Sequence, residues 1–98
     1  MGIRDEYDFG LLVNEAERMV TDELERRLAE LADPGICVCQ DCILDMAALA
    51  LNALKPVYRV SLLGTMYAQA MDEGDYAAQV RLVVDASIAR VHANPGHD

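Results

Sequence analysis

Three cysteines fall within six residues of this chain, at Cys37, Cys39 and Cys42, and form a Cys-x-Cys-x2-Cys run. Thiolate sulfur is a preferred zinc ligand, and two cysteines separated by two residues can place both sulfurs on one tetrahedral ion. The run lies just before a predicted helix, whose N-terminal dipole favours the thiolate form of a nearby cysteine. The pattern therefore predicts a structural zinc site.

Two other interpretations of the cysteines stay open at this level. Cys39 and Cys42 form a Cys-x2-Cys pair at a helix start, as in thiol redox proteins, although no alternation of strands and helices surrounds the pair. Free cysteines also serve as small buried hydrophobic residues. Three cysteines in one short loop fit a metal site better than either alternative.

A tetrahedral zinc site needs a fourth ligand, and the chain has no fourth cysteine. Its two imidazoles are His92, near the end of a predicted helix, and His97, beyond the Asn94-Pro95-Gly96 turn. His92 can instead interact with the last carbonyls of its helix, and His97 can be a terminal residue without a role. Spacing alone does not choose between the two histidines.

Periodic apolar residues predict three main helices, over residues 12–31, 41–54 and 76–91. Asn14, followed by Glu17, predicts a capping box at the start of the first helix. The second helix is apolar on nearly every side, which predicts that it is central in the fold.

The connecting segments are shorter. Residues 57–61 are predicted to be extended, residues 64–71 to form a short helix, and residues 72–75 to form a turn. A chain of 98 residues is long enough for one domain and too short for two. We therefore expect one all-α domain over residues 1–98, a compact bundle of about four to five helices with a short extended segment and a zinc-binding loop.

The composition excludes several classes of function. Seventeen acidic residues against eight basic ones give a net charge of -9, which opposes binding to DNA because that binding rests on phosphate neutralisation by Lys and Arg. No window is long and apolar enough to span a bilayer, and the polar N-terminus is not a secretory signal. No catalytic triad, phosphate loop or paired-carboxylate setting stands out. We expect a cytoplasmic protein that is not an enzyme and does not insert into membranes.

The hydrophobic fraction of 53% is high for so short a chain. Small domains often need a metal or a partner to be stable. We therefore expect part of the apolar surface to be covered by a second copy of the chain.

The motifs as a set resemble the ComFB family, a bacterial family named for a late competence operon. The resemblance runs from about Leu12 to His97. It rests on three segments: Asn14-x2-Glu17-x2-Val20, then Cys37-x-Cys39-x2-Cys42-x2-Asp45-x3-Leu49-Ala50-Leu51-Asn52-x-Leu54-x-Pro56-x-Tyr58, then Asn94-Pro95-x-His97.

The resemblance implies a mostly helical homodimer with one zinc ion per subunit, held by the cysteine loop and by one residue of the C-terminal tail. A family member with four thiolates takes its last cysteine from that tail, where this sequence has His97. The metal ligands that the resemblance implies are therefore Cys37, Cys39, Cys42 and His97, with His92 as the alternative fourth ligand.

The family also includes members that look like receptors for cyclic dinucleotides such as c-di-GMP and c-di-AMP. Such a ligand calls for cations at its phosphates and for rings that stack on its bases. Lys55, Tyr58 and Arg59 supply these groups within five residues, and Arg81 can add a cation. The usual Leu-Pro-Pro-basic-Tyr pattern differs here, with Lys55 for the first proline and Val57 for the basic residue.

The residues also allow another interpretation, in which Tyr58 is part of the core while Lys55 and Arg59 are solvated. In an extended segment Arg59 and Tyr58 point to opposite faces. The expected function is a zinc-stabilised homodimeric regulatory protein that acts in signalling as a cyclic dinucleotide receptor. The alternatives are a protein-interaction adaptor without a nucleotide ligand and a thiol redox protein.

Overall fold

The computed structural model describes residues 2–60 and 74–96, and the elements that follow lie within these ranges. The chain begins with two short helical turns and is then dominated by three long helices and one pair of short strands. In chain order the elements are α1 (Ile3–Glu6), η1 (Phe9–Leu11), β1 (Val13–Asn14), α2 (Glu15–Leu31), α3 (Gln40–Asn52), β2 (Tyr58–Arg59) and α5 (Asp75–Ala93). The expectation of a mostly helical fold is confirmed.

The helix α2 begins at Glu15, three residues later than predicted. Asn14 is its N-cap, and the Asn14 side chain accepts a hydrogen bond from the Ala16 N–H at 3.1 Å. The predicted cap residue is thus correct, but the amide that it caps belongs to Ala16 rather than to Glu17. The helix ends in the left-handed residue Ala32, whose N–H donates to the Leu28 carbonyl at 3.0 Å.

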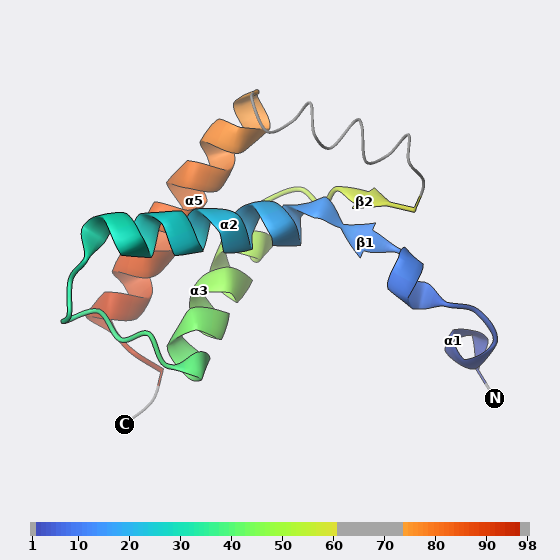
Figure 1. Cartoon of the computed structure of the whole chain (residues 1–98), viewed down its shortest axis with the longest axis horizontal. Coiled ribbons are helices and arrows are strands. Elements are labelled where there is room, and N and C mark those ends of the chain that lie inside the picture. Colours follow the sequence, from blue (N-terminus) through green and yellow to red (C-terminus); the bar gives the residue numbers. More distant parts are fainter. Residues whose placement is uncertain (1, 61–73, 97–98) are drawn as a thin grey trace.

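The strand β1 occupies residues that the periodicity assigned to the first helix. It pairs antiparallel with β2, with Val13 opposite Arg59 and Asn14 opposite Tyr58. Two further hydrogen bonds join Val57 to the start of α2. Its N–H donates to the Asn14 side chain at 2.8 Å, and its carbonyl accepts from the Glu15 N–H at 2.7 Å. The segment after α3 is therefore fixed to the start of α2 (Figure 1).

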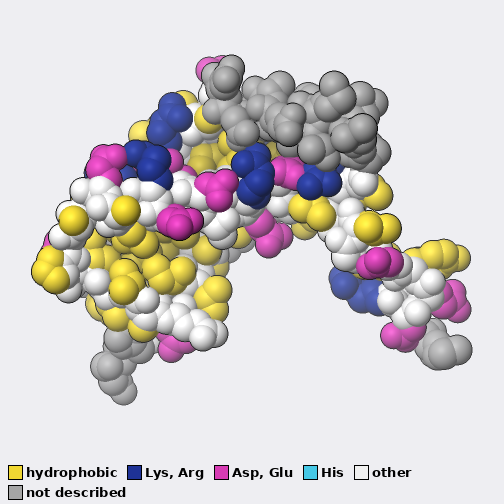
Figure 2. Space-filling model, in the orientation of Figure 1, with side chains coloured by type: hydrophobic (Ala, Val, Ile, Leu, Met, Phe, Trp, Pro, Cys, Tyr) yellow, Lys and Arg dark blue, Asp and Glu magenta, His cyan; other side chains and the backbone are white. Residues whose placement is uncertain are grey.

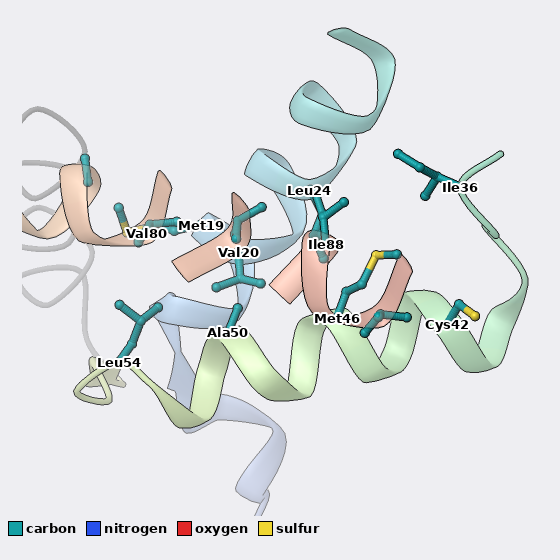
Figure 3. Close-up of a cluster of buried hydrophobic side chains, with 13 residues drawn as sticks. Met19, Val20, Leu24, Ile36, Cys42, Met46, Ala50, Leu54, Val80 and Ile88 are labelled. Carbon is teal, nitrogen blue, oxygen red and sulfur yellow. The ribbon is translucent and has the colours of Figure 1, made fainter. Parts of the chain in front are cut away.

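The core lies between the three long helices, with α3 packed against both α5 and α2. Figure 3 shows side chains from α2, α3, α5 and the cysteine loop pointing into this shared space. The buried side chains of α3 are Cys42, Met46 and Ala50, one face of the helix, whereas Leu44 on another face is 57% exposed. The prediction that α3 is central is correct within the described chain, but one of its apolar faces is open.

The residues before β1 form an arm that leaves the helical body. Neither α1 nor η1 buries a residue, and Ile3, Tyr7 and Leu11 are all exposed. Figure 1 shows this N-terminal arm, residues 2–12, running away from the long helices toward the N-terminus. The arm therefore contributes little to the hydrophobic core.

The predicted short helix at 64–71 lies outside the described residues, as do the first two residues of the predicted turn at 72–75. The last predicted helix is confirmed as α5, and its buried side chains include Val80, Val84, Ile88 and Val91. Among the described residues no helix has the length and hydrophobicity needed to cross a membrane.

Candidate functional site

The three cysteines lie at the junction between the α2–α3 loop and the first turn of α3. Ile36 anchors the loop in the core, and the half-buried Cys37 follows it. Cys39 is the N-cap of α3, and its sulfur accepts a hydrogen bond from the Cys42 N–H at 3.5 Å. Cys42 is fully buried at the edge of the hydrophobic cluster (Figure 3). The core and the helix start thus hold the thiols in place.

The three sulfurs lie within 4.8 Å of one another, although their residues span six positions. Zinc–sulfur bonds of about 2.3 Å in a tetrahedron place the sulfurs about 3.8 Å apart. Only a small inward movement therefore brings all three onto one ion. The donor set and its spacing fit a zinc ion, which supports the predicted metal ligands Cys37, Cys39 and Cys42.

The protein groups around Cys42 disfavour the charged thiolate form of its side chain. Burial raises the pKa of the Cys42 thiol to about 12, and hydrogen bonds with Cys37 and Cys39 raise it as well. A divalent cation reverses this balance, because it stabilises thiolates directly.

The fourth predicted ligand, His97, lies outside the described residues. The alternative, His92, is exposed on α5 and is not part of the three-sulfur cluster. Its ring lies beside the loop, with the Cε1 atom 3.9 Å from the place where a Cβ on Gly35 would stand. The structure thus brings His92 close to the loop without adding it to the group of thiols.

The last described residue, Gly96, lies against α3. A Cβ added to Gly96 would stand 2.8 Å from the Asp45 Oδ2 atom. Asp45 follows Cys42 by three residues, so the two share a face of the helix. The C-terminal segment therefore reaches the part of α3 that carries Cys42.

The four residues predicted to bind a ligand do not gather at one point. Lys55 and Tyr58 are exposed, the latter to 61%, which rules out the interpretation of Tyr58 as a core residue in this chain. The Lys55 carbonyl accepts a hydrogen bond from the Tyr76 hydroxyl at 2.6 Å. Arg59 points to the other face of the strand and forms an ion pair with Glu15. Arg81 is exposed on α5.

Glu15 is a functional candidate that sequence reasoning missed. Its buried carboxylate accepts hydrogen bonds from the Arg18 Nε at 2.8 Å and from the Arg59 Nε. The hydrogen bonds from Arg18 and then Arg59 lower the pKa of Glu15. The spacing of three residues between Glu15 and Arg18 was a usable signal, but Arg59 comes close only through the strand pairing.

Two grooves adjoin Arg18, which lines both. We call the first the arm groove, with a volume of about 500 Å³, and the second the α2–α5 groove, with a volume of about 310 Å³. The arm groove is lined by Arg4, Phe9, Leu12, Val13, Asn14, Glu17, Arg18 and Tyr58. The α2–α5 groove is lined by Arg18, Met19, Asp22, Glu23, Arg26, Ala77, Val80 and Arg81. Tyr58 and Arg81 therefore lie in different grooves that meet at Arg18.

Comparison with known proteins supports one assignment. The family described as late competence development protein ComFB matches residues 13–95. The solved structure of the late competence protein ComFB from Bacillus subtilis is similar, with a TM-score of 0.69 and 28% sequence identity. That similarity covers 87% of this chain and 94% of the Bacillus protein. No curated protein sequence matches the chain.

The family match spans α2, the cysteine loop, α3, β2 and α5, which are the elements that position the thiols, the α2–α5 groove and one wall of the arm groove. It begins at β1 and therefore leaves out the N-terminal arm. The chain belongs to the ComFB family of late competence development proteins.

Proposed function

We propose that this protein is a zinc-stabilised homodimeric regulatory protein that binds a cyclic dinucleotide in the cytoplasm and catalyses no reaction. The observation that carries the metal part is the approach of three sulfurs to within 4.8 Å at the start of α3. Zinc held there ties the loop to the core and stabilises the fold, as structural zinc does in other small domains. His97 of the tail is the fourth ligand in this proposal.

The position of Gly96 supports a ligand from the tail. Its close approach to Asp45 brings the end of the described chain to the face of α3 that carries Cys42. An imidazole ligand that donates its second N–H to a carboxylate is common at zinc sites, because the carboxylate orients the ring. Asp45 offers such a carboxylate one helical turn from Cys42.

The ligand part of the proposal rests on the surface around Arg18. Tyr58 offers an exposed ring for a base, and Arg18 and Arg81 offer guanidinium groups for phosphates. Figure 2 shows Lys and Arg side chains along α2, interspersed with Asp and Glu side chains. Local cations of this kind can bind a small anion although the whole chain has a charge of -9.

A second copy of the chain is proposed to cover the open side of α3 and α5, which we call the α3–α5 face. Leu49 of α3 and Val83 and Ala86 of α5 line one groove on this side, and Ala86 is exposed. Exposed apolar area of this kind favours association with a self-complementary copy. The α3–α5 face is formed by Ala48, Leu49, Val83 and Ala86, which line the grooves between these two helices.

Titration calorimetry with cyclic di-GMP and cyclic di-AMP tests the ligand. We expect heat with at least one of them and a loss of about tenfold in affinity for Tyr58→Ala and for Arg81→Ala, because each removes one stacking or phosphate contact. Arg90→Ala is the matched control, since Arg90 is an exposed cation on the same helix that lines neither groove beside Arg18. No heat with either nucleotide would remove the receptor function and leave an interaction adaptor.

A further inference from the structure

The arm groove has one wall on the helical body and the other on the N-terminal arm. Tyr58, Glu17 and Arg18 line it from β2 and α2, whereas Arg4 and Phe9 line it from the arm. Its volume of about 500 Å³ is within the usual range for small-molecule sites. The arm approaches the body here without burying any residue of α1 or η1.

The lining combines rings with cations. The Arg4 guanidinium lies over the Phe9 ring, 5.3 Å from its centroid, and the Tyr58 ring is exposed on the opposite wall. Arg18 is held by Glu15 and also reaches Asp22 at 3.4 Å, so its position is fixed from two sides. Two aromatic rings and two guanidinium groups facing one groove suit a ligand that carries both planar bases and phosphates.

We propose that the N-terminal arm supplies Arg4 and Phe9 to the nucleotide-binding groove of Tyr58, so that the ligand is held between arm and body. This inference rests on the proposed receptor function and adds two binding residues to it. Neither residue belongs to the part of the chain that matches the family, which starts at residue 13. In this proposal the arm is a binding element rather than a passive extension.

The weak attachment of the arm to the body explains why a bound ligand would restrict the arm's motion. An element without buried side chains gains little from packing, so its observed position is weakly favoured over others. A ligand that contacts both walls of the arm groove favours the observed position by its own binding energy. Binding should therefore protect the amides of residues 2–12 from hydrogen exchange, an effect that a merely structural arm would not show.

The test is calorimetry with cyclic di-GMP and cyclic di-AMP on Arg4→Ala and Phe9→Ala, with hydrogen exchange on the parent protein. Each variant should bind roughly tenfold more weakly, because it loses a charge-assisted or stacking contact. Ile3→Ala is the matched control, since Ile3 is exposed on the same arm and does not line the groove. All three variants should keep the thermal midpoint of the parent, because the arm is outside the core.

The outcomes separate this inference from the receptor function. A parent that binds a cyclic dinucleotide while Arg4→Ala and Phe9→Ala bind equally well overturns the role of the arm and leaves the receptor function standing. An equal loss of affinity in Ile3→Ala also overturns it, because the arm would then act without specific contacts. A parent that binds neither nucleotide overturns both proposals. Weaker binding in the two lining variants alone, with protection of residues 2–12, supports the inference.

Discussion

The sulfur of Cys39 accepts the Cys42 N–H at 3.5 Å, so the residue that caps α3 is also one of the proposed zinc ligands. The start of the helix and the proposed metal site are therefore one structural unit. A zinc ion bound there stabilises the folded state by mass action, because the unfolded chain lacks the preformed cluster.

The first prediction separates the cap from the metal. Cys39→Ser keeps a side chain that caps helices well but removes one thiolate. We expect the variant to lose zinc and about 4 kcal/mol of stability at a metal concentration a thousandfold above the dissociation constant. Thermal unfolding with and without a chelator checks this. The chelator should lower the midpoint of the parent and leave that of Cys39→Ser unchanged; an equal response of the two proteins would contradict the prediction.

The second prediction concerns pH. Glu15 accepts hydrogen bonds from Arg18 and Arg59, which lower its pKa below the ordinary value of 4.5. As the pH falls, the unfolded state therefore takes up a proton at Glu15 before the folded state does. The stabilisation by Glu15 is fully present above the ordinary pKa of 4.5 and is lost as the pH falls through the lowered pKa of the folded state.

Glu15→Gln removes this charge while keeping the shape of the side chain. We expect it to reduce the free energy of unfolding by about 1–3 kcal/mol at pH 7, since hydrogen bonds to a charged group are lost. The difference from the parent should shrink below the ordinary pKa of the carboxyl. Urea unfolding at several pH values measures it, with Glu25→Gln as the control because Glu25 is exposed on the same helix. A constant difference across pH would exclude the assigned role.

The third prediction concerns the C-terminal segment. Gly96→Ala places a methyl group 2.8 Å from the Asp45 carboxylate unless one of them moves. We expect the segment to shift and zinc affinity to fall by roughly tenfold, the low end of what lost outer-shell contacts cost at metal sites. Competition with a chromophoric chelator measures the affinity. Gly74→Ala is the control, because no atom of the described residues lies within 4 Å of its added Cβ; equal affinities in the two variants would disprove the link.

The fourth prediction concerns assembly. Ala86→Glu puts a charge on the α3–α5 face, and we expect it to convert a dimer into a monomer because a buried unpaired carboxylate is costly. Light scattering at micromolar concentration gives the mass directly. Ala29→Glu is the control, since Ala29 is exposed on α2, away from that face. A dimer that tolerates Ala86→Glu, or a parent that is already a monomer, would show that this face is not the interface.

Much of the fold was accessible from sequence because its elements are long and periodic. The three main helices were predicted to within three residues of their observed ends, and the loop with Cys37, Cys39 and Cys42 was identified as a cluster. The strand β1 was missed because two residues carry no periodic signal. Its existence depends on pairing with Tyr58 and Arg59, more than forty positions away.

The candidate ligand site could be predicted only in part, because it too depends on the long-range pairing of β1 with β2. The alternation of an extended segment correctly indicated that Tyr58 and Arg59 face opposite sides. The partner of Arg59 could not be predicted, because Glu15 is brought to it by the register of β1 and β2. The groove around Tyr58 includes Phe9 of the arm, whose position relative to the body follows no periodic pattern.

The most direct test of the central claim is the metal content and coordination of the protein purified without added zinc. Elemental analysis, combined with X-ray absorption at the zinc edge, should find one zinc ion per chain bound by three sulfur ligands and one nitrogen ligand. His97→Ala should lose the nitrogen signal, whereas His92→Ala should keep it. A protein that is folded, fully stable and free of zinc would contradict the account.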